Sequence, residues 1–324
     1  MTSEFYYFNR FIFIETIIQN DETGRMTFEQ LRIFLVVAEL QHVTRAARQL
    51  NLTQSAVSAA ISSLETRYDV RLFDRIGRGV VLNSAGQVFV AEARRVMDDL
   101  AHARTFLAEL SGVPAGRLTI AASQTVASYW MPQLLVRFSA QFPKVDLRLQ
   151  AGNTETVERA VRQHEVDVGV VEGLSSDSGL LMEPVARDRL VLIVGLDHVW
   201  ADGRSLDMRD LTETTWIMRE TGSGTRAAFH NDLKSSDINP AELRILMELP
   251  SNEACLAAVA AGQSATVLSR RAAATAIEAG RLKEVELGLS VRHFTALRHP
   301  ERQESLALRQ LMAAFRSDFS AAPG

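Results

Sequence analysis

Hydroxyl and amide side chains gather at the start of one short predicted helix, within TQSAVSAAISSLE (residues 53–65). A glutamine such as Gln54 can form two hydrogen bonds with adenine, and serine hydroxyls can bond to bases or phosphates. The other side of this helix is apolar, so it can pack on a neighbouring helix while its first turns reach base edges in the major groove. The residues expected to contact DNA here are Thr53, Gln54, Ser55 and Ser58.

The elements before this helix complete a helix-turn-helix pattern. Apolar residues recur at helical spacing between residues 26 and 40, and RAARQL (45–50) predicts a second short helix with Thr44 as its N-cap. A tight turn follows, and Thr53 caps the helix that reads DNA. Arginines only slightly outnumber acids between residues 26 and 84, so charge alone leaves open an ordinary helical bundle with exposed polar residues.

A hairpin is predicted directly after the helix-turn-helix. VRLFDRIGRGVVLN (70–83) contains two short β-prone runs around Gly77 and Gly79. Arginines on such a hairpin can bind phosphates or enter the minor groove, as the wing of a winged helix does. We expect Arg75 and Arg78 to make these contacts.

A long helix with a heptad pattern follows, from SAGQVFV to the stop at Gly112 and Pro114. Its apolar residues alternate steps of four and three, which is typical of a seam between paired helices. We expect two chains to pair here, which suits a protein that reads two half-sites; packing of the seam on the chain's own C-terminal domain is the alternative. The seam residues are Phe89, Ala93, Val96, Leu100, Ala103, Leu107 and Leu110.

Beyond Gly116 the sequence alternates predicted strands and helices, which indicates a parallel sheet flanked by helices. Two successive sets of such elements suggest two lobes, with a ligand between them at the carboxyl ends of the strands. The segments AASQT (121–125), GNTE (152–155) and RETGSGTR (219–226) fall where strands end and helices begin, and the last of them favours a small anion. Helix capping alone would also explain these residues. The candidate ligand contacts are Ser123, Thr125, Asn153, Arg219, Ser223, Thr225 and Arg226.

The composition is that of an ordinary globular protein, and the sequence shows no recognised enzyme motif. The chain has 324 residues, of which 47% are hydrophobic and 23% charged, and its net charge is −4, so any basic surface is local. Its single cysteine, Cys255, is expected to be a buried thiol in a reducing cytoplasm. TGSGT lacks the spacing of a nucleophile elbow, and the histidines show no recognised metal-ligand spacing. We expect no catalytic residues, no metal, no cofactor and no membrane-spanning segment.

These patterns divide the chain into four parts. Residues 26–84 are the predicted winged helix-turn-helix, 85–112 the linker and dimerisation helix, and 113–324 the two-lobed ligand-binding domain. Residues 1–25 are aromatic and apolar but carry no small-residue cleavage site, so we expect no signal peptide. Two interpretations of them stay open: an over-extended start before Met26, or an appendage that packs on a partner.

The chain resembles the LysR-type transcriptional regulators of bacteria. The segments that carry the resemblance are LRIFLVVAE, AARQLNLTQSAVSAAISSLE, VRLFDR and LNSAGQVF. GNTE, VDVGVVEG and WIMRETGSGTRAAF resemble the branch that holds CysL-type sulfur-assimilation and CbbR-type carbon-fixation regulators. The resemblance implies an α/β protein with an N-terminal winged helix-turn-helix, a long linker helix and a periplasmic-binding-protein-like effector domain.

The resemblance also implies partners and residue roles. Such regulators bind double-stranded DNA as dimers of dimers, and a small co-inducer between the lobes changes DNA bending or contact with RNA polymerase. Ser123 and Thr125 resemble a hydroxyl pair that holds the co-inducer, here a small anion such as sulfite or sulfate, with Ser223 and Thr225 facing it. The rival hypothesis is a solute-binding protein or enzyme whose N-terminal helices serve only assembly.

Three departures from the family pattern affect these expectations. Ala60 stands where a glutamine is usual in the reading helix, which changes what that helix can recognise. Thr221 replaces a proline in the glycine-rich turn, and Gln263 and Ser264 replace Leu-Gly after a later helix. We expect the last two departures to alter the shape of the ligand cleft.

Overall fold

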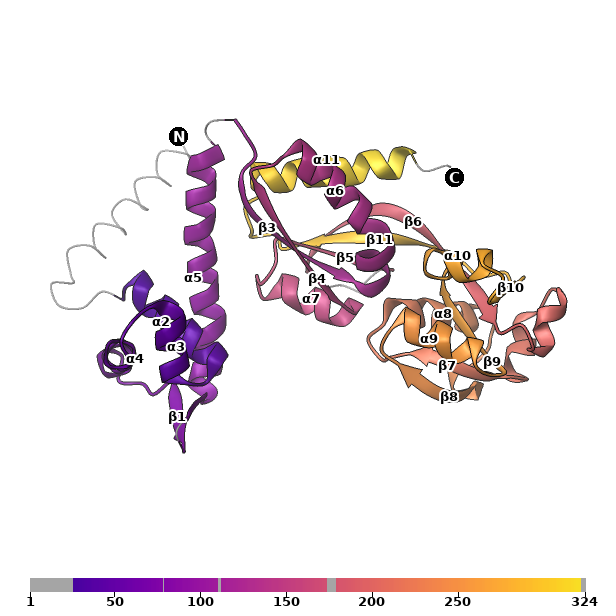
Figure 1. Cartoon of the computed structure of the whole chain (residues 1–324), viewed down its shortest axis with the longest axis horizontal. Coiled ribbons are helices and arrows are strands. Elements are labelled where there is room, and N and C mark those ends of the chain that lie inside the picture. The colour runs from indigo at the N-terminus through magenta and orange to yellow at the C-terminus, as the bar shows by residue number, and fades with distance from the viewer. Residues whose placement is uncertain (1–25, 78, 110–111, 174–178, 322–324) are drawn as a thin grey trace, which may run out of the picture. The chain divides into compact units, whose positions relative to one another are not determined.

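The protein is described by a computed structural model that covers residues 26–77, 79–109, 112–173 and 179–321. The N-terminal segment 1–25, Arg78 and Leu110 therefore lie outside the described residues. The chain forms two compact units that divide after Ala101, within the long helix α5 (Ser84–Glu109) (Figure 1).

The first unit begins with three short helices, α2 (Phe28–Leu40), α3 (Val43–Leu50) and α4 (Gln54–Arg67). Thr53 caps α4 as predicted, because its hydroxyl accepts a hydrogen bond from the Ala56 N–H at 3.1 Å. The prediction that Thr44 caps the preceding helix is wrong. α3 begins at Val43, two residues before the predicted start at Arg45, and its N-cap His42 makes no side-chain capping bond.

The predicted hairpin is present as β1 (Phe73–Ile76) and β2 (Gly79–Leu82), which pair antiparallel. Gly77 lies in its turn with φ +60°, a conformation that other residues rarely adopt. The carboxylate of Glu65 in α4 accepts hydrogen bonds from the Leu72 and Phe73 N–H groups, at 2.7 and 3.2 Å. The hairpin is thus fixed to the C-terminal half of α4.

Helix α5 starts inside the core of the first unit. The ring of Phe89 lies 4.9 Å from that of Phe34, and Ala93 is buried in the same core. Further along the seam Val96 is 38% exposed and Leu107 is 67% exposed. The first part of the seam therefore packs on the chain's own N-terminal unit, and exposed apolar side chains lie further along it.

The second unit contains one nine-stranded sheet in the order β4-β3-β5-β11-β6-β9-β7-β8, with β10 paired to β6. Strands β3, β4 and β5 are parallel, as are β7, β8 and β9, whereas β11 is antiparallel to both its neighbours. The strands are β3 (Gly116–Ser123), β4 (Val145–Gly152), β5 (Val168–Glu172), β6 (Leu181–Val194), β7 (Thr215–Arg219), β8 (Arg244–Leu249), β9 (Ser264–Ser269), β10 (Lys283–Val285) and β11 (Val291–Arg298).

The helices cover both faces of this sheet. They are the π-helical turn η1 (Val126–Trp130), α6 (Met131–Gln141), α7 (Thr154–Arg162), α8 (Gly224–Ser235), α9 (Asn252–Ala260), α10 (Arg270–Glu278) and α11 (Leu306–Ala321). Three short 3-10 turns lie between β6 and β8 in the chain: η2 (Val199–Asp202), η3 (Met208–Thr212) and η4 (Pro240–Glu242). None of the helices in the described part of the chain is long and apolar enough to cross a membrane.

Two lobes share the sheet. In lobe I, α6 and α11 pack on one face around Trp130 and Phe315, and α7 packs on the other (Figure 1). In lobe II, α8 packs on one face around Trp216 and Phe229, and α9 and α10 pack on the other. Strand β6 pairs with β11 up to Arg189 and with β9 from Leu190 onward, so it runs from one lobe into the other. The predicted two-lobed α/β architecture is confirmed.

Candidate nucleic-acid interface and interlobe cleft

The first turn of α4 presents polar side chains to the surface. Thr53, Gln54, Ser55 and Ser58 are all exposed. The Gln54 Oε1 atom accepts a hydrogen bond from the Thr44 hydroxyl at 3.1 Å, which fixes the orientation of its amide. This bond engages the amide oxygen, and the amide nitrogen of Gln54 keeps its capacity to donate to a base edge.

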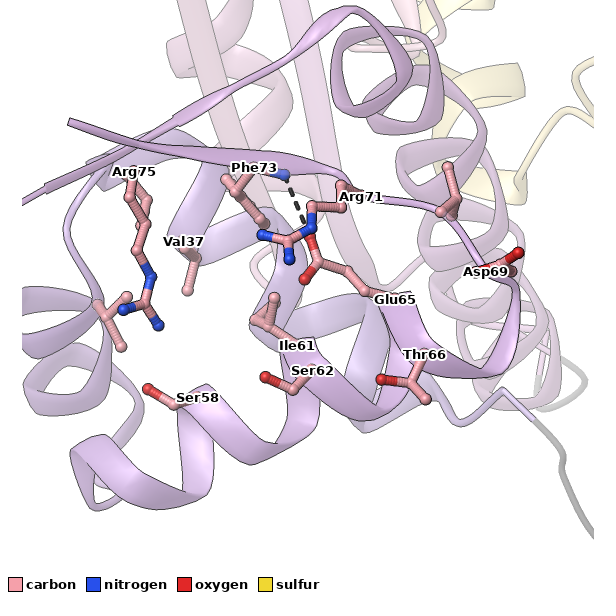
Figure 2. Close-up of a pocket in the computed structure, with 13 residues that line it drawn as sticks. Val37, Ser58, Ile61, Ser62, Glu65, Thr66, Asp69, Arg71, Phe73 and Arg75 are labelled. Carbon is pink, nitrogen blue, oxygen red and sulfur yellow. Dashed lines mark hydrogen bonds between the residues drawn. The ribbon is translucent and has the colours of Figure 1, made fainter.

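A groove of about 710 Å³ lies between α4 and the hairpin. Figure 2 shows Ser58 on α4 and Arg75 on β1 facing this groove, so two predicted contacts from separate elements share one surface. Ser62 and Thr66 line the same groove, although the sequence analysis did not select them. Ser58, Ser62 and Thr66 follow one another at intervals of four residues along α4, so they lie on the same face of the helix.

Arg71 and Arg75 line this groove, and Arg45 and Arg48 lie on α3. Within the part of the chain that the structure describes, the exposed side chains of Arg45, Arg48, Arg71 and Arg75 form no ion pair. The Glu65 carboxylate is engaged by backbone N–H groups of the hairpin, as the dashed bond in Figure 2 indicates. Guanidinium groups without an acidic partner can bind phosphate oxygens, so this surface fits a nucleic-acid backbone despite the acidic net charge of the chain.

Polar residues also meet where the lobes face each other, at the ends of β3 and β7. Thr125, fully buried, accepts a hydrogen bond at 3.2 Å from the Asn252 side chain at the start of α9. The amide oxygen of Asn252 in turn accepts from the Arg219 guanidinium at 2.8 Å. Ser123 is 1% exposed, and its hydroxyl has no hydrogen-bond partner among the described residues. The structure thus brings the predicted residues Thr125 and Arg219 together through Asn252, which the sequence analysis missed.

A second set of bonds links the lobes beside this site. The Gln124 side chain accepts from the Asn252 N–H at 2.8 Å and donates to Glu253 at 2.7 Å, and the Tyr129 hydroxyl also donates to Glu253. Burial raises the pKa of Tyr129, and its bond to Glu253 raises it further. Burial acts to raise the pKa of Glu253 as well, but its hydrogen bonds from Tyr129 and other donors outweigh this and lower it. We call Gln124, Tyr129, Asn252 and Glu253 the interlobe latch.

A buried ion pair lies where the chain passes between the lobes. The Arg292 guanidinium is 2.7 Å from the Asp188 carboxylate, and both side chains are almost completely buried. The Ser269 hydroxyl donates to Asp188 at 2.6 Å, and Arg292 donates to the Thr225 hydroxyl at 3.1 Å. Thr225, a predicted ligand contact, therefore accepts a bond from within the chain. Arg292 and Asp188 belong to no recognisable sequence motif. Their pairing follows only from the register of β6 and β11.

The glycine-rich turn before α8 meets the start of α7 across the cleft. Ser223 caps α8, and Gly222 before it has φ +88°, a conformation that residues with a side chain rarely adopt. Asn153 itself caps α7. The Arg226 side chain donates to the Arg219 carbonyl at 3.1 Å and pairs with Glu248 at 2.7 Å. Asn153, Ser223 and Arg226 thus already have structural roles in this arrangement.

The mouth of the cleft is a groove of about 500 Å³ beside this turn. Thr221 lines it, so the departure at this position does lie at the cleft, together with Glu155, Glu158 and Arg226. The expectation that Gln263 and Ser264 also alter the shape of the cleft is wrong. Ser264 lies at the first residue of β9, bonded to Thr215 at 2.8 Å, at the opposite end of the strands from Arg219.

Cys255 is buried in lobe II, as expected. Burial raises the pKa of its thiol to about 11. The thiolate is the reactive form of cysteine, so this residue is suited to packing rather than chemistry.

Comparison with known families identifies both units. Residues 111–320 match the family model described as LysR substrate binding domain, and residues 28–87 match the model described as bacterial regulatory helix-turn-helix protein, lysR family. The uncharacterized HTH-type transcriptional regulator YeiE of Escherichia coli is 32% identical over 289 residues, which cover 89% of this chain and 96% of that protein.

Two further relatives bear on the expected branch. A probable RuBisCO transcriptional regulator of Phaeodactylum tricornutum is 32% identical, covering 81% of this chain and 85% of its own. The HTH-type transcriptional regulator CysL of Bacillus subtilis is 29% identical, covering 76% and 81%. These relatives confirm the resemblance to the branch of sulfur and carbon-fixation regulators.

Solved structures show the same fold. Full-length CbnR complexed with its target DNA superposes with a TM-score of 0.69 at 21% identity, covering 90% of this chain and 100% of that chain. The regulatory domain of CcmR from Synechocystis PCC6803, in complex with 2-PG, gives a TM-score of 0.59 at 26% identity, covering 64% and 99%. The family models and the relatives describe transcriptional regulators rather than enzymes, and the chain belongs to the LysR family as a LysR-type transcriptional regulator with a LysR substrate binding domain.

Proposed function

We propose that this regulator reads promoter DNA in the cytoplasm through α4 and the β1–β2 hairpin. The exposed Gln54 and Ser58 contact bases in the major groove, and Arg75 contacts the phosphate backbone. Arg71 and Arg75, which line the groove and form no ion pair within the described residues, support this assignment, and so does CbnR, a relative in fold whose structure was solved with its target DNA. Arg78, outside the described residues, belongs to the same proposed contact by its place in the hairpin sequence.

We further propose that a small anion between the lobes controls DNA binding. The observation that carries this proposal is the buried hydroxyl of Ser123, which has no hydrogen-bond partner among the described residues and precedes a helical segment that begins at Gln124. The first N–H groups of a helix have no partner within it and favour negative charge. Sulfite, sulfate and other small oxyanions fit these donors. Thr125 and Arg219, which are linked through Asn252, and Ser223, the N-cap of α8, are the further contacts that we propose.

Ligand binding would act by shifting the population of two arrangements of the lobes. An anion that binds the closed arrangement better must favour the bonds of the interlobe latch, because those bonds exist only when the lobes are together. The linker helix would pass this change to a second chain through the exposed seam residues Val96, Ala103 and Leu107 and the half-buried Leu100, giving dimers and then tetramers. Re-spacing of the reading helices, or contact with RNA polymerase, would then alter transcription.

The ligand is tested by thermal unfolding of the purified protein with sulfite, sulfate, thiosulfate, phosphate, acetylserine, sugar phosphates and 2-PG. A ligand that binds only the folded state raises the melting temperature. We expect one anion to do so in the wild type and in Ser317→Ala, a matched control on the exposed face of α11. We expect the shift to disappear in Ser123→Ala.

The outcomes separate the two halves of the proposal. A shift that Ser123→Ala leaves intact removes this residue from the site, and no shift with any compound contradicts the anionic ligand class. Neither result touches DNA binding, which a mobility shift with promoter DNA measures independently.

A further inference from the structure

Two histidines and a glutamate meet on lobe I, at the opposite end of α7 from Asn153. His164 follows the C-terminus of α7, and His299 and Glu301 follow β11. The candidate metal-ligand atoms of these three side chains all lie within 4.8 Å of one another, and the two imidazole rings are 4.0 Å apart between centroids. Nothing in the proposed regulatory function uses this cluster.

The chemistry of the three side chains is that of a transition-metal site. Imidazole nitrogens and a carboxylate oxygen bind Zn²⁺ at roughly 2.0–2.2 Å, so tetrahedral ligands lie about 3.4 Å apart. The observed separations need only side-chain rotation to reach this value, and Glu301 is exposed and able to rotate. Solvent at the exposed side can supply water as a fourth ligand. Calcium and magnesium prefer oxygen ligands throughout, so two imidazoles favour a zinc-like ion instead.

The backbone around the cluster is held in place by bonds that do not involve the proposed ligand atoms. His164 adopts a left-handed conformation, with φ +57°. Its carbonyl accepts from the Arg302 guanidinium at 2.8 Å, and Arg302 also pairs with Asp167 at 2.6 Å. Arg302 thus ties the end of α7 to the segment after β11, and Asp167 compensates its positive charge beside an incoming cation.

The hydrogen bond to the His299 ring must change when a metal binds. The Glu301 N–H donates to Nδ1 of His299 at 3.2 Å, which places the ring proton on Nε2 in the neutral form. A metal bound at Nε2 moves that proton to Nδ1 and ends this bond. At 3.2 Å the bond is at the long end of the normal range, so metal coordination can outweigh its loss.

We propose that His164, His299 and Glu301 form a binding site for one Zn²⁺-like divalent transition-metal ion. The ion would clamp the C-terminal end of α7 to the segment between β11 and α11. Asn153, at the other end of α7, lies at the cleft, so the metal site and the effector site occupy opposite ends of one helix.

The test is calorimetric titration of the untagged full-length chain with Zn²⁺, with Co²⁺ as a spectroscopic probe of nitrogen and oxygen ligands. We expect one ion per chain. His164→Asn removes the imidazole but keeps a residue that tolerates positive φ, and it and His299→Asn should each weaken binding by roughly ten- to one-hundred-fold. Glu301→Gln, a change at an exposed position, should weaken binding with no effect on the metal-free melting temperature. His293→Asn, an exposed histidine on β11, is the matched control.

The proposal is overturned if wild type and the His164→Asn, His299→Asn double variant bind Zn²⁺ with the same stoichiometry and affinity, or if wild type binds none. A rise in melting temperature with Zn²⁺ that Glu301→Gln reduces supports it. The result does not depend on DNA or anion binding, so failure here leaves the regulatory function intact.

Discussion

The DNA-reading surface and the interlobe cleft use the same residue types in opposite ways. On α4 the polar side chains are neighbours in sequence and exposed, and Arg75 beside them has no ion-pair partner within the described residues. In the cleft Thr125 bonds to a residue 127 positions away, and Arg219 is 4% exposed with its guanidinium bonded to Asn252 and Glu220. The polar side chains of the reading surface are exposed to a binding partner. In the cleft, most polar side chains bond to one another and hold the lobes together.

This difference separates function from stability. Exposed polar residues contribute little to folding, so changing them should affect binding alone. Buried charged residues that bond to one another contribute to stability mostly through the cost of leaving one of them unpaired. Mutations in the two regions should therefore give opposite patterns of effects.

The largest expected effect is that of Asp188→Asn in the buried ion pair. Within the described residues, the substitution leaves the buried Arg292 charge with Glu172, at 4.0 Å, as its one remaining carboxylate partner. We expect the free energy of unfolding of the C-terminal unit to fall by roughly 3–5 kcal/mol, measured by urea denaturation. DNA affinity per folded molecule should change far less.

The matched control is Asp146→Asn, which breaks the exposed pair between Asp146 and Arg117. Its effect should stay within about 0.2–1 kcal/mol. Equal losses in the two variants would show that the buried pair contributes no more than a surface one, and would remove the contrast between the regions.

The next effect in size is that of Gln54→Ala combined with Ser58→Ala on the reading helix. Loss of base contacts should weaken specific promoter binding by roughly ten- to one-hundred-fold, measured by fluorescence anisotropy at fixed salt. Stability should not change, because both side chains are exposed.

Ser63→Ala is the control for the reading helix. Ser63 is exposed on the same helix but accepts a bond from Gln30 instead of lining the groove. If the double variant binds the promoter as tightly as Ser63→Ala does, α4 does not read bases through these residues.

The reading helix was predictable because its information is local. Thr53 caps its own helix three residues on, and the turn and hairpin follow within one short stretch. Thr44 was predicted as an N-cap but lies inside α3, where its hydroxyl bonds to Gln54. Helix ends are uncertain by one or two residues, and a hydroxyl can lie inside a helix as well as before it. Ser62 and Thr66 could have been found from their helical spacing to Ser58.

The cleft was predictable only in outline. Ser123 ends β3 as predicted, and Asn153 and Ser223 stand directly before α7 and α8, because the rule that strand ends precede helix starts depends on element order alone. Asn252, with partners more than a hundred positions away, and the ion pair of Asp188 and Arg292 depend on sheet register, which no short motif encodes. The same holds for the proposed metal site, whose histidines come from separate segments.

The smallest predicted effect concerns Glu253 in the interlobe latch. Burial acts to raise its pKa, but bonds from Tyr129 and its other donors lower it below the ordinary value of 4.5. A carboxyl whose pKa is lower in the folded state stabilises the fold above its unfolded pKa and loses that contribution as the pH falls through its folded pKa. Glu253→Gln should therefore lower the melting temperature slightly at neutral pH, and the difference from wild type should shrink below pH 4.5.

Tyr129→Phe distinguishes the latch from a general charge effect, because it keeps the carboxylate and removes one donor to it. It should reproduce part of the pH-dependent difference seen with Glu253→Gln. A melting-temperature difference that stays constant across this pH range in both variants would mean that the carboxylate gains nothing from the latch. The latch bonds would then form when the lobes are closed without stabilising the closed arrangement. The polar residues of the latch would contribute as little to stability as those of the reading surface.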